Sequence, residues 1–341
     1  LARRCPRGRN GGRRMKPERI KKAGYTYLNV AAVVACLAVI ALILVAVLFR
    51  APGEDVSSVA SEQASSAPPD ETSVDDNVSG AESESPSGPF AALTELSVAN
   101  TQVSEGDLIL VSNENTYAHP DPDALTSIFE NKRGSYKCGD TAGLAEERAL
   151  DAFNDMLDDF YAATGCGSVT VLYGYLTPEQ AGDRYNAASD KAHAAQAGGS
   201  DFHTGLSFSL TVYPQSDGSI GDGSYAWLAD NAHRYGFVLR YPSDKLGVTG
   251  ITPSDGHYRY VGRAAAAYIY ENGLCLEEFL DRVEQTTPEE PLRWDCEAGS
   301  FAAYFQRATG ETQTTIRVPA SLEYSVSGNN RDGFVVIASV G

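Results

Sequence analysis

The sequence predicts an α+β domain built on a largely antiparallel sheet with flanking helices, preceded by one transmembrane helix. From Asp107 onward, helical stretches alternate with short strand-like stretches separated by Gly and Pro turns, which is typical of the α+β class. Upstream, residues 30–49 form an unbroken apolar run. We therefore expect one folded domain of roughly 230 residues, large enough to bury a substantial core.

Charge divides the chain into a basic N-terminus and an acidic remainder. Of the 27 Lys and Arg residues, ten lie in residues 1–29 beside a single acidic residue, whereas the whole chain has a net charge of −18. A chain this acidic beyond its N-terminus is a poor match for polyanions. We therefore expect no nucleic-acid partner.

Residues 30–49 predict a membrane anchor. Twenty apolar residues in a helix rise about 30 Å, which is the thickness of the hydrocarbon core of a bilayer. The basic excess before this run places the N-terminus in the cytoplasm and the C-terminal domain outside it. The expected location is the cell membrane, with a single pass. A cleaved signal peptide is the alternative interpretation.

A Ser-rich, acidic stretch follows the apolar run. Residues 51–89 contain ten Ser and nine Asp or Glu but no Lys, Arg or aromatic residue, so they cannot build a core. We interpret this stretch as a tether between the membrane and the folded part. The predicted organisation is a basic cytoplasmic tail (1–29), a transmembrane helix (30–49), a disordered tether (50–100), a folded α+β domain (101–290) and a small β appendage (291–341).

The first three predicted elements of the folded domain are a strand, a helix and a second strand. The apolar run LILVS, residues 108–112, predicts a strand. Leu144–Ala163 predicts a helix, because its apolar residues recur every three or four positions and Gly165 follows as a stop. Ser168–Tyr175, which reads SVTVLYGY, then predicts a buried strand.

Later elements are marked by caps and by a change of period. Thr177 precedes Pro and is followed three residues on by Gln, which predicts the start of a helix. Ser200–Tyr213 alternates apolar and polar residues and predicts a half-buried strand. Further strands are expected from Phe237 and from His257, and an Ala-rich helix at Arg263–Glu271.

Four cysteines lie in the predicted extracytoplasmic part, where disulfides form readily. Pairing by proximity joins Cys138 to Cys166 and Cys275 to Cys296. Sequence alone leaves all three possible pairings open. A zinc cluster of these cysteines is disfavoured, because no two of them have CxxC spacing.

Five segments in order along the chain resemble the zinc D-alanyl-D-alanine carboxypeptidases of the VanY type. LILVSNENTY is similar to the opening strand of that family, LYGYLTPEQ to its SGYRSxxxQ segment and SDFHTGLSFS to its SxHxTGxAxD segment. YGFVLRYP with the later HYRYVG, and then GLCLEEFL, complete the match. The resemblance implies a hedgehog/D-Ala-D-Ala carboxypeptidase-like fold and metal-assisted peptide hydrolysis.

The resemblance also shows where this sequence departs from the family. The family's zinc ligands are a His, an Asp seven residues later and a later His, and these positions hold Phe202, Ser209 and His257. Only His257 is retained. The family's general base, a Glu three residues before the last His, is matched by Ser254.

The substrate side of the site departs from the family as well. The Arg that faces the substrate carboxylate in the family is matched by Leu176, and the Ser of the same segment by Tyr173. The resemblance places a binding groove for a peptide at Tyr173, Ser200, Ser207 and His257.

A rearranged metal site is the competing interpretation. His203 could replace Phe202 as a ligand, with Asp201 or Asp255 supplying a carboxylate. Neighbouring residues of an extended strand point to opposite faces, so His203 should point away from the pocket if Phe202 points into it. We therefore expect no bound cofactor, and zinc only if this interpretation holds.

The leading hypothesis is a membrane-anchored, extracytoplasmic D-alanyl-D-alanine carboxypeptidase-like domain that is catalytically degenerate and binds cell-wall peptide or has a regulatory role. One alternative is an active zinc D,D-carboxypeptidase that removes the terminal D-Ala of peptidoglycan stem peptides. The other is a purely structural surface domain. The expected partners are the membrane and, for the first two hypotheses, a peptidoglycan stem peptide.

Overall fold

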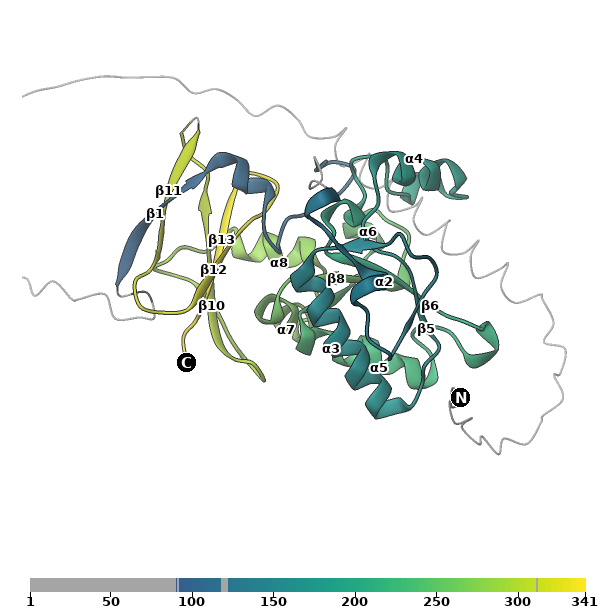
Figure 1. Cartoon of the computed structure of the whole chain (residues 1–341). Helices are drawn as coiled ribbons and strands as arrows, with labels where there is room; N and C mark the ends of the chain where they lie inside the picture. Colours follow the sequence, from purple (N-terminus) through teal and green to yellow (C-terminus); the bar gives the residue numbers. More distant parts are fainter. Residues whose placement is uncertain (1–89, 91, 118–121, 311) are drawn as a thin grey trace, which may run out of the picture. The chain divides into compact units, whose positions relative to one another are not determined.

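A five-stranded sheet organises the central part of the chain (Figure 1). Its order is β3-β5-β6-β8-β7; β3 and β5 are parallel and every other neighbouring pair is antiparallel. The α+β prediction with a largely antiparallel sheet is therefore confirmed. The strands of this sheet are β3 (Lys137–Cys138), β5 (Val169–Tyr173), β6 (Ser207–Val212), β7 (Phe237–Tyr241) and β8 (Ser254–Tyr260).

The computed structural model describes residues 90, 92–117, 122–310 and 312–341, all of which belong to one compact unit. The predicted cytoplasmic tail, the transmembrane helix at 30–49 and most of the tether lie outside these residues. Within the described ranges, no helix combines the length and the apolar character needed to cross a bilayer.

Helix α3 (Glu147–Thr164) supplies the core on one face of this sheet. Its apolar stripe is fully buried, and the ring of Phe153 stacks on Phe208 of β6 with centroids 4.2 Å apart. Gly165 follows with φ of 70°, a left-handed conformation that ends the helix as predicted.

The other helices lie around the two sheets. In α4 (Pro178–Ala187), Thr177 and Gln180 form the predicted capping box. The remaining helices are α2 (Ile128–Asn131), α5 (Ala226–Asn231), α6 (Leu246–Thr249), α7 (Arg263–Glu271) and α8 (Leu276–Val283), and a two-stranded ladder joins β2 (Thr126–Ser127) to β4 (Leu144–Ala145).

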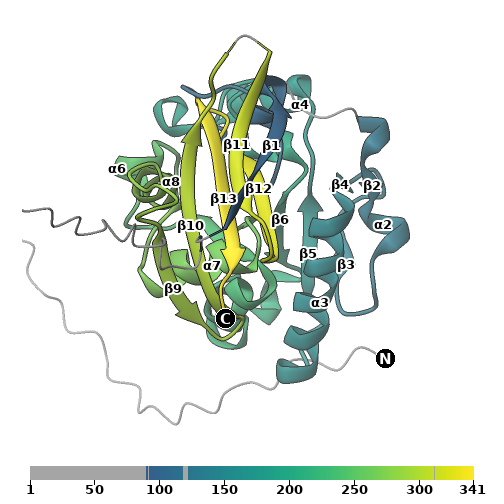
Figure 2. The same cartoon turned by 90° about the vertical axis from the view of Figure 1, so that its left-hand side faces the viewer.

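The C-terminal strands form a separate antiparallel sheet in the order β12-β13-β10-β9 (Figure 2). A second, two-stranded ladder pairs β1 with β11 across seven register positions. Residues 93–99, which we expected within the tether, therefore form a strand that belongs to the C-terminal β structure. The strands are β1 (Leu93–Ala99), β9 (Leu292–Cys296), β10 (Gly299–Arg307), β11 (Gln313–Pro319), β12 (Tyr324–Gly328) and β13 (Gly333–Ser339).

The predicted strand at residues 108–112 is wrong. Leu108 to Val111 are buried, but they form no ladder. Their backbone groups bond elsewhere: Leu110 N–H donates to Asn329 O at 3.2 Å, and the Arg259 guanidinium donates to Ile109 O at 2.9 Å. The apolar run therefore marks a buried connection between the two sheets rather than a strand.

Within Ser200–Tyr213, the predicted strand begins later than expected. Asp201–Thr204 form a 3-10 turn that ends at Gly205, whose φ is 69°, and β6 starts at Ser207. From there the predicted alternation holds for Phe208, Leu210 and Val212, which are buried.

Neither predicted disulfide is present, because Cys138, Cys275 and Cys296 are free thiols. Cys138 lies opposite Val171 in the sheet, five residues beyond Cys166 along the chain. Extended chain covers about 16 Å over five residues, more than a disulfide can span. Cys275 is the N-cap residue of α8, where its N–H donates to Glu278 at 2.9 Å, and burial raises the pKa of its thiol to about 12.

Replacing Phe153 should destabilise the fold strongly. Phe153→Ala removes a fully buried ring that stacks on Phe208, so we expect a loss of about 3–5 kcal/mol in the free energy of unfolding. Urea unfolding followed by Trp fluorescence measures it. Tyr161→Ala on the same helix, at a side chain that is 42% exposed, should cost less than about 1 kcal/mol. Equal losses for the two variants would contradict this packing.

Candidate functional site

The substituted family positions converge on one pocket. It has a volume of about 210 Å³ and lies among β5, α4, the 3-10 turn Asp201–Thr204, β6 and β8. We call it the His257 pocket. The singled-out positions that line it are Tyr173, Leu176, Ser200, Asp201, Phe202, Ser209, Ser254 and His257.

The sheet and the turn before β6 bring the three family ligand positions together. Ser209 on β6 and His257 on β8 are register partners in the antiparallel ladder. Phe202 comes from the 3-10 turn, and its ring stacks on the His257 imidazole with centroids 4.1 Å apart and planes at 21°. Tyr241 contacts the same imidazole edge to face at 4.8 Å. His257 is therefore packed between aromatic rings.

A buried charge cluster lies beneath the pocket. The Asp201 carboxylate is 1% exposed, and its Oδ1 accepts from Arg259 at 2.6 Å and from Arg240 Nε at 3.2 Å. Its Oδ2 accepts from the Ser207 hydroxyl. Arg240 also binds Glu277 through two hydrogen bonds of 2.8 and 2.9 Å. Every charge of this cluster has an opposite partner, which a buried ion needs.

This cluster sets the protonation states around the pocket. Burial alone would raise the pKa of Asp201, but Arg259 and Arg240 hold it well below its usual range. Burial lowers the pKa of His257, and this effect exceeds the opposing influence of Asp201. His257 Nε2 lies 3.3 Å from Asp201 Oδ2 without good hydrogen-bond geometry.

The residues present do not fit a zinc ion. A catalytic zinc site requires three nitrogen, sulfur or carboxylate ligands. The three family positions offer one imidazole, one neutral hydroxyl and one phenyl ring, and the phenyl ring covers the imidazole face. In the described part of the chain, no three His, Cys, Asp or Glu side chains come close enough together to hold a metal.

The substitute zinc ligands considered from the sequence, which are His203, Asp201 and Asp255, do not complete a set of three ligands. His203 is fully buried, and its Nδ1 donates to Leu176 O at 2.7 Å while its Nε2 accepts from Gly198 N–H at 3.0 Å. Both ring nitrogens are thus engaged away from the His257 pocket. The two oxygens of Asp201 are engaged by Arg259, Arg240 and Ser207, and Asp255 is exposed outside the pocket.

Residues 201–204 form a 3-10 turn, so the strand alternation that we expected to place Phe202 and His203 on opposite faces does not apply. The predicted groove also changes in one member. Ser207 is fully buried against Asp201 and does not line the pocket, whereas Tyr173, Ser200 and His257 do.

Arg184 on α4 lines the His257 pocket and was missed by the sequence analysis. Its guanidinium carbon lies 3.6 Å from the centroid of the Tyr173 ring. The charged partners of Asp201, which are Arg240 and Arg259, were also missed as members of the site. No spacing rule marks Arg184, because it matches no family motif and lies eight residues after Leu176 on another element.

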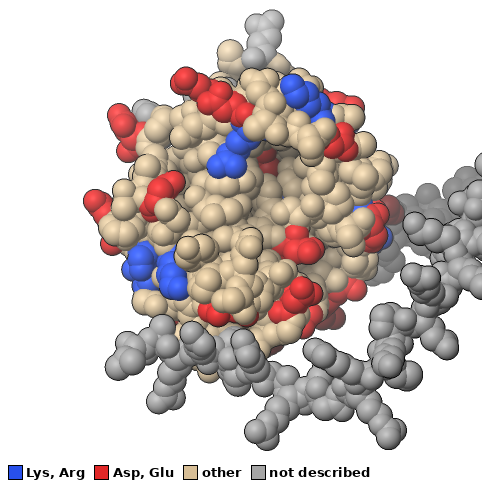
Figure 3. Space-filling model, turned by 90° about the vertical axis from the view of Figure 1, so that its right-hand side faces the viewer, with Lys and Arg blue, Asp and Glu red and all other residues tan. Residues whose placement is uncertain are grey.

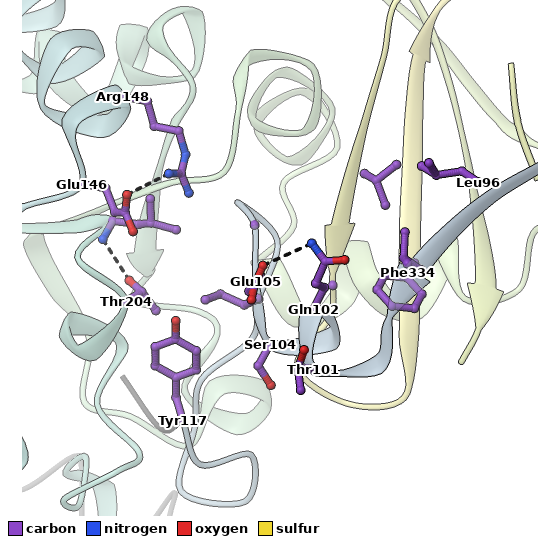
Figure 4. A pocket seen from close by; sticks show the side chains of 16 residues that line it. Leu96, Thr101, Gln102, Ser104, Glu105, Tyr117, Glu146, Arg148, Thr204 and Phe334 are labelled. Carbon is purple, nitrogen blue, oxygen red and sulfur yellow. Dashed lines mark hydrogen bonds and ion pairs between the residues drawn. The ribbon is translucent and has the colours of Figure 1, made fainter. Parts of the chain in front are cut away.

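A larger cavity of about 750 Å³ lies apart from these residues, between β1, β12 and the start of α3 (Figure 4). Its polar groups bond to one another: Arg148 donates to Glu146 at 2.8 Å, and Gln102 donates to Glu105 at 3.4 Å. It contains none of the singled-out site residues, so its size alone does not make it the functional site.

Surface charge is sparse on one side of the molecule. In Figure 3, the few Lys and Arg side chains lie in small separate groups, and Asp and Glu side chains are spread over the same face. This face offers no extended basic patch of the kind that binds nucleic acid.

The fold and the His257 pocket together define a D-Ala-D-Ala carboxypeptidase-like protein. Residues 170–263 match the family model VanY, described as D-alanyl-D-alanine carboxypeptidase. This match includes nearly all of β5, the whole of β6, β7 and β8, and every residue that lines the His257 pocket. The resemblance to the VanY type seen in the sequence is confirmed for this part of the chain.

Similar proteins carry the same description. A D-alanyl-D-alanine carboxypeptidase of Enterococcus faecium is 27% identical over 255 residues, which are 73% of this chain and 80% of that protein. A D-alanyl-D-alanine carboxypeptidase of Enterococcus faecalis is 44% identical over 103 residues, or 28% of this chain and 37% of that protein.

The solved structure of the vancomycin resistance D,D-dipeptidase VanXYg, in complex with a D-Ala-D-Ala phosphinate analog, has a similar fold. Its TM-score is 0.62 at 22% identity, and the match covers 72% of this chain and 99% of that chain.

Asp201→Asn should destabilise the protein by about 3–5 kcal/mol, because it leaves Arg240 and Arg259 buried without their counter-charge. Chemical unfolding at neutral pH measures this. Asp255→Asn, at an exposed position three residues before Tyr258, should change the free energy of unfolding by less than about 0.5 kcal/mol. A mild Asp201→Asn variant would contradict the role of the cluster.

The same cluster predicts an acid response. Because the pKa of Asp201 is depressed in the folded state, its contribution to stability is complete above the usual aspartate pKa and is lost as pH falls below it. The free energy of unfolding should therefore fall more steeply below about pH 4 in the wild type than in Asp201→Asn. Parallel pH profiles for the two proteins would contradict this.

Proposed function

We propose that the chain is a membrane-anchored, extracytoplasmic D-alanyl-D-alanine carboxypeptidase-like protein that binds the end of a cell-wall peptide without zinc-dependent hydrolysis. In this role it binds or regulates rather than cleaves. The observation that carries the proposal is the stacking of Phe202 on His257 at the position of a zinc ligand.

The chemistry lost at the other positions supports the same conclusion. Metallopeptidases need a metal that acidifies water and a carboxylate that takes the proton. The general-base position holds Ser254, whose hydroxyl is no base near neutral pH. The carboxylate that lines the pocket, that of Asp201, is held ionised by hydrogen bonds from Arg240 and Arg259, so it is not free to move a proton.

Retention of a pocket supports binding over a purely structural role. The His257 pocket remains a cavity of about 210 Å³ although Phe202 and Tyr173 have added bulk to it. Hydroxyl groups of Ser200, Ser209 and Ser254 line it. The similar proteins from the two Enterococcus species are described as D-alanyl-D-alanine carboxypeptidases, which makes a peptide ending in D-Ala-D-Ala the first ligand to test.

Anchoring remains a proposal from the sequence. The apolar run at 30–49, with basic residues before it and a Ser-rich acidic stretch after it, supports a single pass with the folded domain outside the cytoplasm. A protease added to intact cells should then remove the folded domain and leave the N-terminal tail protected.

The purified full chain should release no D-Ala from a peptide ending in D-Ala-D-Ala, with or without a chelator, because it lacks the donors that hold a catalytic metal. Release is measured by coupled D-amino-acid oxidation, with zinc added in excess. Chelator-sensitive release would overturn the proposal and establish the active enzyme. Absence of both release and peptide binding would favour the purely structural alternative.

Restoring the ligands gives the matched control. Phe202→His with Ser209→Asp should bind about one zinc per chain, because both positions lie beside His257. Zinc is measured by equilibrium dialysis, and the wild type should retain far less under the same conditions. A double variant that binds no more zinc than the wild type would show that these substitutions are not what excludes the metal.

A further inference from the structure

Arg184 is a cation without a carboxylate partner beside the His257 pocket. It lies on the exposed side of α4, and no ion pair to an Asp or Glu of the described residues involves it. Most other arginines near the sheet are paired, as Arg240 and Arg259 are. An unpaired guanidinium at a cavity is available to a ligand.

Aromatic packing holds this guanidinium in place. Arg184 stacks on the Tyr173 ring at 3.6 Å, and Tyr173 in turn packs edge to face on Phe202 at 4.7 Å. Such stacking fixes the plane of the guanidinium while leaving its N–H groups free to donate. The substitutions at 173 and 202 therefore build a platform for Arg184.

The charges of the residues that line the pocket favour an anionic ligand. Asp201 is the negatively charged residue that lines the pocket, and its ion pairs with Arg240 and Arg259 neutralise that charge. Among the described residues that line the His257 pocket, Arg184 is the sole Lys or Arg. The uncompensated charge is thus positive, although the whole chain is strongly acidic.

We propose that Arg184 binds the C-terminal carboxylate of a short peptide in the His257 pocket. This rests on the proposed function and names the residue that recognises the ligand. Leu176, at the family's arginine position, is 4% exposed and cannot pair with a carboxylate. Arg184 reaches the same cavity from α4, and a cavity of about 210 Å³ suits the terminal part of a peptide rather than a whole one.

The test compares N-acetyl-D-Ala-D-Ala with its C-terminal amide, using the full chain in detergent and isothermal titration calorimetry. The free acid should bind about 10- to 100-fold more tightly than the amide, the range expected for a charge-assisted pair. Arg184→Gln should lose that preference, because its affinity for the free acid falls while its affinity for the amide stays the same. Arg184→Lys should retain part of the preference.

Lys191→Gln is the matched control, because Lys191 lies 5.5 Å from the ring of Tyr185, a pocket residue, but does not itself line the pocket. It should change affinity for the acid less than about twofold. Thermal melting should show that all variants remain folded.

The outcomes separate the two proposals. If the wild type prefers the acid and Arg184→Gln abolishes that preference, the role of Arg184 is supported. If the acid binds equally well to wild type and Arg184→Gln, Arg184 is not the anchor, while peptide binding stands. If neither peptide binds the wild type, both proposals are overturned.

Discussion

The structure depends on one buried carboxylate, that of Asp201. Arg240 on β7 and Arg259 on β8 both bind it, and Arg259 also binds the backbone oxygens of Asp107 and Ile109. The carboxylate therefore ties the 3-10 turn before β6 to two neighbouring strands and to the connection between the two sheets. A buried carboxylate whose oxygens all accept hydrogen bonds is held rigidly, and it fixes the positions of the neighbouring side chains.

Phe202 follows Asp201 directly in the 3-10 turn, so the contacts that hold Asp201 also fix the position of Phe202. With the turn held by Asp201, the Phe202 ring stacks on His257 and covers one face of the imidazole. Under the proposed function, the residues at positions 209 and 254 are chemically consistent, because a pocket that holds no metal has no use for a further ligand or a base. The proposed function thus keeps the fold and changes the chemistry of the site, which one scaffold can accommodate.

Periodicity and motif order predicted the main sheet, α3, α4 and α7, because these follow local spacing and caps. The predictions that were wrong depend on distant partners. LILVS looks like a strand, yet Arg259 and Asn329 bind its backbone groups. Leu93–Ala99 falls in the predicted tether, yet it pairs with β11. The substituted positions could be placed from motifs, whereas Arg184 became visible only through the stacking on Tyr173, which links two elements that the sequence does not align.

The most direct test of the central claim is the ring of His257 itself. Nitrogen NMR of the histidine side chains, recorded while zinc is added to the full chain, reports whether that imidazole binds a metal. We predict that its resonances stay unchanged at one equivalent of zinc, because Phe202 covers the ring and the nearby carboxylate of Asp201 is engaged by Ser207, Arg240 and Arg259. A shift of the His257 resonances that saturates at one equivalent would contradict the account.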